Sequence, residues 1–412
     1  MAFGMFTTPQ SPIAIDFGSS SVKLMQLDRG EKPKLLAAAE LPIPASIRRT
    51  PQHVFAHMEV ELPALLKSAG FKGKRVVTAI PPALTYIQHM QIAETPGVRL
   101  DEIVLGQLQM QMNCAPGALV VRCIPVPDAK CRDNSRSEVI CFAAARDMVM
   151  RYVQLLNRCK LDVAGVHTES MATIWAYRHL NRREEDANAP TMYINLGWQG
   201  ATVTISHGTR IVFSRYIHVG GHSFDQQIAR IARCDEHEAA AQRHSLERPL
   251  TRAAARAPAA EAPAPVAAAR TAGPPSAVDS AAASATVAER RLSATPDDLI
   301  PVPMCATAPA IIDRYRLGEL VDTVVDEISM CLRYHRGVFA NLPVTRAIFV
   351  GGDARQAWLT RTIADHLSMN AYVGDPLRRF AGAELFTPGL NLAEPRPGWS
   401  VACGLCHAPS DQ

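Results

Sequence analysis

Apolar positions along this 412-residue chain fall in short alternating or continuous runs, typical of β-strands, and in longer runs of helical spacing. Three runs near the start are separated by short turns, which predicts an antiparallel meander. These strands are predicted at 13–17, 21–28 and 34–42. Further strand and helix patterns alternate up to residue 181. The first half is therefore predicted to form a mixed sheet with helices packed on it.

The second half of the chain repeats this order. Another meander is predicted at 191–196, 201–206 and 210–218, followed by a helix from about 223 to 233. A helical stripe of apolar residues covers 321–338, and a buried strand at 346–352 precedes a helix near 355–368. Since the two halves share one plan, the sequence predicts an α/β protein with two similar lobes.

Residues 245–309 differ from both halves in composition. Ala, Pro, Arg, Ser and Thr dominate this segment, which offers too little apolar surface to offset the cost of ordering the chain. We therefore predict a disordered Ala/Pro-rich insertion. The segment also carries several of the arginines, and the formal net charge of the chain is only +4. Charge thus gives no case for nucleic-acid binding.

The sequence favours a cytoplasmic location. The ten cysteines form no disulfide framework and are expected to be reduced thiols. The first residues do not have the pattern of a signal peptide. No uncharged apolar run is long enough to cross a bilayer. Any association with a membrane is therefore expected to occur through a partner.

Two short stretches, 180 residues apart, share one arrangement. In IAIDFGSSSVKLMQL an apolar run ends at Asp16 and turns through Gly18, and in YINLGWQGATVTI a similar run ends at Asn195 and turns through Gly197. Turns of small residues leave backbone N–H groups unobstructed, as binding a phosphate chain requires. Two such loops, one on each lobe, predict that one nucleotide binds between the lobes and contacts both loops.

Four positions near the loops are candidates for chemistry. Asp16 could hold a Mg²⁺-bound water near phosphates, or it could cap a hairpin turn. Lys23 could face phosphate or solvent. Glu169 could position a water, or it could be a glutamate favoured at a helix N-terminus. Gly351–Gly352 follows a buried strand and would let a ligand approach a helix N-terminus, although many such turns use a glycine pair.

The two loops are chemically unequal. Asn195 stands where Asp16 leads one to expect a second carboxylate. An asparagine carries no charge, so it holds a divalent cation less well than an aspartate and cannot act as a base. The sequence therefore predicts a site that holds a nucleotide more readily than it cleaves one.

These motifs resemble those of a known superfamily. IDFGSSSVKLMQL is similar to the first phosphate loop of the actin-like ATPases, and the stretch from INLGWQGATV to FDQQIA is similar to the second. AIFVGGDARQAWLTRTIADHL resembles the adenosine motif, and two further segments resemble the connecting segments. The resemblance covers nearly the whole chain outside 245–309. Within the superfamily, the sequence SSSVK in this loop is most similar to that of the PilM family of type IV pilus assembly.

The resemblance implies ATP and Mg²⁺ between two RNase H-like lobes, with a small subdomain inserted in lobe one. The implied nucleotide contacts are Gly18, Ser19, Ser20, Lys23, Gly197, Thr202, Gly351 and Gly352. The implied domains are lobe one at 1–42 and 127–189, the inserted subdomain at 43–126, and lobe two at 190–244 and 310–412. Also implied is binding, beside the inserted subdomain, of the short cytoplasmic tail of a single-span inner-membrane pilus protein. Ala201 lacks the hydroxyl usual at its position.

The leading hypothesis is a cytoplasmic, ATP-binding scaffold for assembly of a type IV pilus or a related secretion system. Any ATPase activity would be weak, with Glu169 and Asp16 as catalytic candidates. One alternative is a sugar kinase of the same superfamily, for which 43–126 offers few carboxylates. Those carboxylates are Glu59, Glu61, Asp101 and Glu102. Another alternative, favoured by Asn195, is a scaffold of a pilus or type II secretion machine that has lost its nucleotide.

Overall fold

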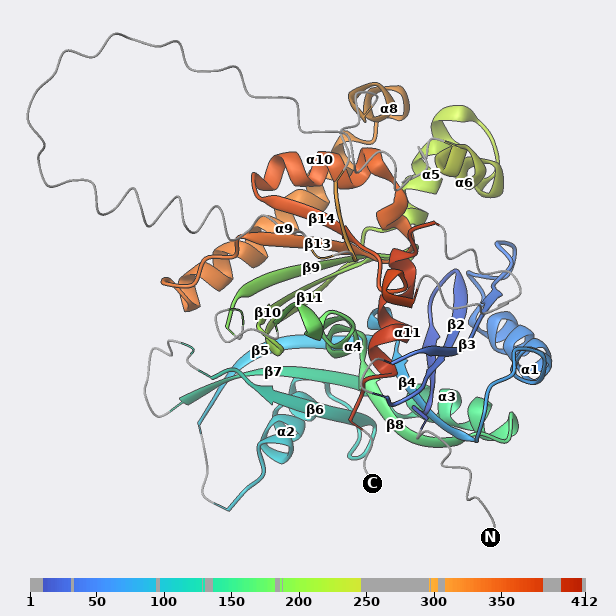
Figure 1. Ribbon diagram of the computed structural model, residues 1–412. Coiled ribbons are helices and arrows are strands. Elements are labelled where there is room, and N and C mark those ends of the chain that lie inside the picture. Colours follow the sequence, from blue (N-terminus) through green and yellow to red (C-terminus); the bar gives the residue numbers. More distant parts are fainter. Residues whose placement is uncertain are drawn as a thin grey trace, which may run out of the picture.

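The computed structural model describes residues 10–30, 33–93, 97–127, 129, 136–181, 186, 188–245, 296, 298–302, 308–380 and 394–409. These residues form two lobes, each built on a mixed β-sheet, and a small antiparallel sheet beneath lobe two (Figure 1). The predicted fold class, an α/β protein of two similar lobes with a small inserted subdomain, is confirmed.

The first sheet has five strands in the order β3-β2-β1-β4-β8. They are β1 (Ile13–Phe17), β2 (Ser21–Leu27), β3 (Leu35–Pro42), β4 (Arg75–Ile80) and β8 (Asp162–Thr168). The first three form the predicted antiparallel meander, and β4 and β8 continue the sheet in parallel with β1. Helices α1 (Pro51–Ser68) and α3 (Arg146–Arg158) cover one face, where Tyr152 packs on Phe17.

The second sheet repeats this topology in the order β11-β10-β9-β13-β14-β12. Its strands are β9 (Pro190–Leu196), β10 (Ala201–His207), β11 (Arg210–Ile217), β12 (Leu299–Pro301), β13 (Arg346–Val350) and β14 (Asn370–Gly374). Its helices are α5 (Gly221–Ala232), α6 (Glu236–Ser245), α8 (Ala308–Tyr315), α9 (Gly318–Val338) and α10 (Ala357–Leu367). The predicted apolar stripe of α9 is buried, and Phe224 of α5 meets Trp358 of α10 edge to face in the same core.

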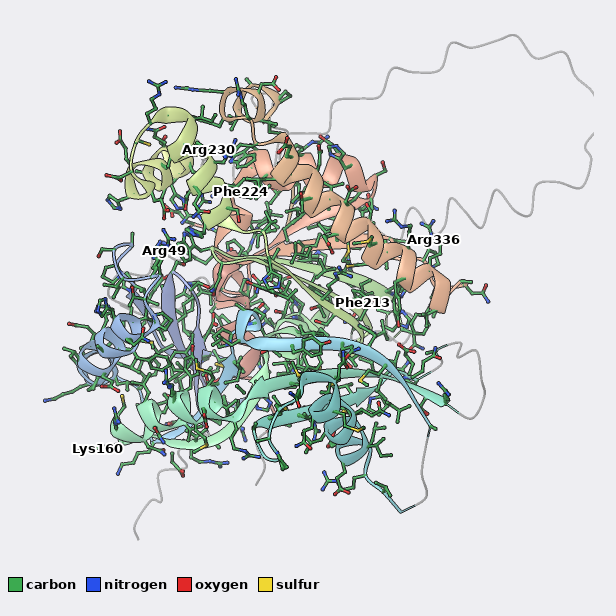
Figure 2. The ribbon with its side chains drawn as sticks, turned by 180° about the vertical axis from the view of Figure 1, so that it is seen from behind. Arg49, Lys160, Phe213, Phe224, Arg230 and Arg336 are labelled. Carbon is green, nitrogen blue, oxygen red and sulfur yellow. The ribbon has the colours of Figure 1, made fainter. Side chains whose placement is uncertain are left out.

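The small sheet has the order β5-β7-β6, all antiparallel. Its strands are β5 (Thr85–Ala93), β6 (Leu119–Pro125) and β7 (Arg136–Ala145), and α2 (Leu100–Met112) packs on one face. On the other side His89 stacks on Phe213 of β11, with ring centroids 4.6 Å apart. Figure 2 shows Phe213 at the edge of the second sheet that faces the small sheet.

The boundaries predicted for the inserted subdomain were wrong. Within 43–126, α1 and β4 belong to the first sheet and its helices, whereas β7, predicted as part of lobe one, is the central strand of the small sheet. The apolar run of β7 is suited to a central strand of either sheet, because such strands are buried on both faces. Pattern alone therefore could not decide which sheet it joins.

Most of the predicted insertion, 246–295, lies outside the described residues. The end of the same range was not predicted correctly, because it contains a strand. Strand β12 pairs antiparallel with β14 and so extends the second sheet, and α8 begins at Ala308. A strand of three residues is too short to produce a periodic pattern, and the surrounding Ala/Pro composition hides it.

Two short helices lie between the sheets, α4 (Glu169–Ala176) and α11 (Ser400–Leu405) (Figure 1). They cross so closely that a Cβ on Gly404 would lie 1.7 Å from the carbonyl oxygen of Ala172. Residues of both sheets join these helices in one hydrophobic cluster. Among the described helices, none is both long and apolar enough to span a membrane.

Candidate functional site

A cavity of about 310 Å³ lies between the lobes, with residues of both sheets in its walls. Every residue predicted for the nucleotide site lines it. They are Asp16, Gly18, Ser19, Ser20, Lys23, Glu169, Gly197, Thr202, Gly351 and Gly352. The carboxyl ends of β1 and β9 both open onto this cavity, because the two sheets are related by the same topology. Their direct contact with a ligand stays a prediction.

In lobe one the loop between β1 and β2 forms the cavity wall. A Cβ on Gly18 would lie 2.8 Å from the carbonyl oxygen of Ser21, so this tight turn requires a glycine. Lys23 pairs in register with Asp16 and is buried, which excludes the solvent-facing alternative. Its Nζ donates to Ser21 Oγ at 2.9 Å and lies 3.8 Å from Glu40 Oε1. The lysine is therefore held at the cavity wall.

In lobe two the loop between β9 and β10 forms the opposite wall. The backbone N–H of Gly197 donates to the carbonyl oxygen of Gly200 at 3.0 Å, which closes the turn. A Cβ on Gly200 would lie 2.3 Å from Tyr216 Oη, so this position also requires a glycine. Ser19 Oγ donates to Gln199 Oε1 across 3.4 Å. The two loops therefore touch each other across the cleft.

Glu169 and Asp16 are two acids on one wall of the cavity. Burial raises the pKa of Glu169 to about 7, and the charge of Asp16 adds to the shift, while hydrogen bonds from Thr202 and Asn195 oppose it. Burial likewise raises the pKa of Asp16 to about 6, against the attraction of Lys23. The Asn195 amide donates to Glu169 Oε1 at 2.7 Å. Near neutral pH, ionisation of one of these carboxyls therefore disfavours ionisation of the other.

Gly351 and Gly352 close the far end of the cavity. Gly351 has a φ of 91°, and a Cβ there would lie 2.2 Å from Asn195 Oδ1. The helix predicted near 355–368 after this pair is α10, which spans Ala357–Leu367. A 3₁₀ turn, Gly352–Arg355, lies between the two. Gly351 thus lets the backbones of β9 and β13 approach each other beside the cavity.

Sequence reasoning missed a buried arginine at this end. Arg243 of α6 donates from Nε to Asp225 Oδ1 at 2.6 Å and from Nη1 to Asp353 Oδ1 at 2.8 Å. Its side chain is 1 % exposed. Arg243 lies at the border of the Ala/Pro-rich segment, where neither periodicity nor a motif marks it. Trp198 and Arg48, which also line the cavity, were missed as well.

The cavity suits a Mg²⁺ ion that is bound partly by the phosphates of a ligand. Mg²⁺ is commonly bound by one or two carboxylates together with substrate phosphates and waters. Asp16 supplies one buried carboxylate in the cavity wall. Among the residues that the structure describes, no three His, Cys, Asp or Glu side chains are grouped to hold a metal ion. Asp16 is thus the residue here that would hold Mg²⁺ together with phosphate oxygens and waters.

The chain matches one family model and resembles several solved structures. A family model described as type IV pilus assembly protein PilM matches residues 14–252. The solved structure of a PilM–PilN type IV pilus biogenesis complex has a TM-score of 0.68, with 16% sequence identity over 97% of this chain and 98% of that chain. This likeness shows the same fold. No curated protein matches the chain.

Two further solved structures have lower TM-scores. Ethanolamine utilization protein EutJ from Carboxydothermus hydrogenoformans has a TM-score of 0.44, with 10% identity over 97% of this chain and 90% of that chain. MreB 5 of Spiroplasma citri, solved with AMPPNP, has a TM-score of 0.43, with 11% identity over 91% of this chain and 94% of that chain.

Proposed function

This chain belongs to the PilM family of type IV pilus assembly proteins, and we propose that it acts there as an ATP-binding scaffold. The observation that carries the proposal is the meeting of two glycine loops, one from each lobe, on a single cavity that also contains Lys23 and Gly351–Gly352. Loops of this kind suit phosphates, and a cavity between two lobes suits an elongated ligand that contacts both.

In the proposed complex each part of the site has one task. The backbone N–H groups near Gly18 and Gly197 bind the phosphate chain, and Lys23 supplies positive charge beside it. The glycine pair at 351–352 lets the nucleoside approach the backbone. Asp16 would help to hold Mg²⁺, which would neutralise part of the phosphate charge when bound. Binding of ATP would favour one arrangement of the lobes and so one affinity for a partner.

We propose that turnover of ATP is slow. Asn195 offers an uncharged amide where a carboxylate would position a metal or a water, and this amide is already bonded to Glu169. The proton of Glu169 is held near neutral pH, so the side chain is only partly available as a base. The arrangement favours retention of ATP over its hydrolysis.

Isothermal titration calorimetry of the full chain with ATP, with and without Mg²⁺, tests the binding proposal. We expect binding of one ATP and its loss in Gly18→Val, because a larger side chain would close the loop against Ser21. Gly337→Ala, at a position with no atom within 4 Å of the added carbon, serves as the control. If the wild-type chain binds no ATP in the presence of Mg²⁺, the proposal is wrong.

We also propose that the chain binds the short cytoplasmic tail of an inner-membrane pilus protein, as the solved PilM–PilN complex suggests. Such binding would hold the chain at the inner face of that membrane. Strand β6 is an edge strand of the small sheet, and an extended peptide can add to such an edge. Val120 on this strand and Met110 on α2 are exposed apolar residues that a peptide could cover.

Fluorescence anisotropy with labelled peptides of candidate membrane-protein tails tests this partner. We expect Val120→Glu to abolish binding, whereas Val60→Glu should not, because Val60 is equally apolar and 72% exposed but lies on α1. Equal binding by both variants would place the tail elsewhere.

The sugar-kinase alternative gains no support from the carboxylates of 43–126. None of these four acidic side chains is among the described residues that line the cavity. Glu59 instead pairs with Arg158, and Asp101 accepts the backbone N–H of Cys123. Robust ATP-dependent phosphorylation of a sugar would nevertheless overturn the scaffold proposal. The nucleotide-free alternative would be excluded by ATP that co-purifies with the chain.

A further inference from the structure

Arg48 lies in the turn between β3 and α1, and a short chain of hydrogen bonds links this turn to the first glycine loop. The backbone N–H of Ile43 donates to the carbonyl oxygen of Ser20 at 2.9 Å. The carbonyl oxygen of Ile43 in turn accepts from Arg48 Nε at 2.8 Å. Two hydrogen bonds thus connect the loop around Ser20 to the guanidinium of Arg48.

The same guanidinium reaches across the cleft to the second glycine loop. Its central carbon lies 5.6 Å from the ring centroid of Trp198, which is a cation–π contact. Trp198 is itself fixed in lobe two, because its Nε1 donates to Asp225 Oδ2 at 3.2 Å and its ring packs on His222. Arg48 thus belongs to lobe one but rests on lobe two.

The cations of the cavity differ in how they are neutralised. Arg243 is bonded to two aspartates, and Lys23 is bonded to Ser21 beside Glu40. Arg48 is half-buried, and within the described part of the chain its terminal nitrogens have no carboxylate within 4 Å. Burial lowers the pKa of Arg48, the charge of Arg243 lowers it further, and two aspartates oppose them.

A half-buried guanidinium of this kind is suited to an anion. Guanidinium groups bind phosphate through pairs of N–H donors, and such charge-assisted hydrogen bonds are strong. The neighbouring Arg49 has a different environment, because it is exposed and already paired with Glu236 of α6 at 3.0 Å. Figure 2 shows Arg49 between the lobe-one turn and helices α5 and α6. The two adjacent arginines therefore form a natural test and control.

We propose that Arg48 binds the phosphate chain of the nucleotide from lobe one while resting on Trp198, and so ties closure of the cleft to the number of phosphates present. This inference rests on the proposed ATP site. A nucleotide held between the two loops lies between the groups to which Arg48 is attached. ATP would then hold the lobes together more strongly than ADP or AMP. The contact between the lobes would therefore depend on which nucleotide is bound.

Calorimetry of ATP, ADP and AMP binding to wild type, Arg48→Ala, Arg48→Lys and Arg49→Ala tests this proposal. Arg48→Ala should weaken ATP binding roughly ten- to a hundredfold, as loss of a charged hydrogen-bond partner implies. The loss should be smaller for ADP and slight for AMP, and Arg48→Lys should recover part of it. Arg49→Ala should stay within about twofold of wild type, because exposed ion pairs contribute little.

The outcomes separate this proposal from the one it rests on. If wild type binds none of the three nucleotides, the proposal of an ATP site is wrong, and the proposed role of Arg48 is wrong with it. If wild type binds ATP and Arg48→Ala binds it equally well, only the role of Arg48 is wrong. An equal loss for AMP and ATP would assign Arg48 to the nucleoside and overturn the phosphate contact. Circular dichroism of each variant checks its fold, and Arg48→Lys keeps the test decisive should Arg48→Ala not fold.

Discussion

Asn195 at the end of β9 donates a hydrogen bond of 2.7 Å to Glu169 at the start of α4, so lobe two supplies an amide to a carboxyl of lobe one. The amide stabilises Glu169 without adding a charge. A carboxylate at the same position would repel both Glu169 and Asp16. The identity of this one side chain therefore sets how many protons the site carries.

Asn195→Asp should destabilise the chain at alkaline pH. The hydrogen-bond donor to Glu169 is lost and a third acid is added, so we expect the free energy of unfolding to fall by about 1–3 kcal/mol at pH 8. At pH 5 the acids take up protons and the loss should shrink. Urea unfolding at both pH values measures this, and equal losses at the two would contradict the electrostatic account.

Glu169→Gln should remove part of the pH dependence of stability. Because the folded-state pKa of Glu169 is raised from 4.5 to about 7, its carboxyl binds more protons in the folded chain than in the unfolded chain. Stability from this group is complete below pH 4.5 and is lost as the pH rises through 7. The variant should therefore exceed wild type by on the order of 2 kcal/mol at pH 8 and match it at pH 4. Urea unfolding across this range is the measurement, and Glu236→Gln on the surface is the control.

Arg243→Met should be strongly destabilising. The substitution leaves Asp225 and Asp353 buried beside each other without their shared partner, and breaking a buried ion pair costs about 3–5 kcal/mol. Denaturant unfolding measures the loss. The triple variant that also carries Asp225→Asn and Asp353→Asn should recover much of it. A single variant as stable as wild type would show that the aspartates do not depend on the arginine.

Gly404→Ala should prevent normal packing of α11 on α4. The added carbon would lie 1.7 Å from the carbonyl oxygen of Ala172, and backbone at both sides leaves it nowhere to move. We expect a loss of about 3 kcal/mol or more, or failure to fold, as for severe overpacking. Gly337→Ala in α9 should instead be neutral or stabilising by up to about 1 kcal/mol. Thermal unfolding of the pair decides, and similar melting temperatures would contradict the close crossing.

The sequence predicted those parts of the fold that local patterns of apolar residues determine. The two meanders and the stripe on α9 were correct because alternation and helical spacing report directly on which face is buried. Strand β5 was not predicted, since its polar residues, among them the adjacent Gln88 and His89, break the alternation and most of its positions are only partly buried. The small sheet was misassigned because pairing between distant strands leaves no local signal.

The candidate site was predicted where glycine was needed and missed where packing decides. Gly18 and Gly351 are visible in the sequence because a tight turn or close approach excludes other residues. Arg48 and Arg243 look like ordinary surface arginines. Only folding brings one onto Trp198 and the other between two aspartates.

The place of α11 also bears on how the chain is made. Its residues 400–405 pack against strands β1, β2 and β4, and Cys406 donates from Sγ to the carbonyl oxygen of Met25. Synthesis proceeds from the N-terminus, so the part of the first sheet that α11 covers stays uncovered while more than 200 residues after β8 emerge from the ribosome. Lobe one is thus the first part to be synthesised and among the last to be completed.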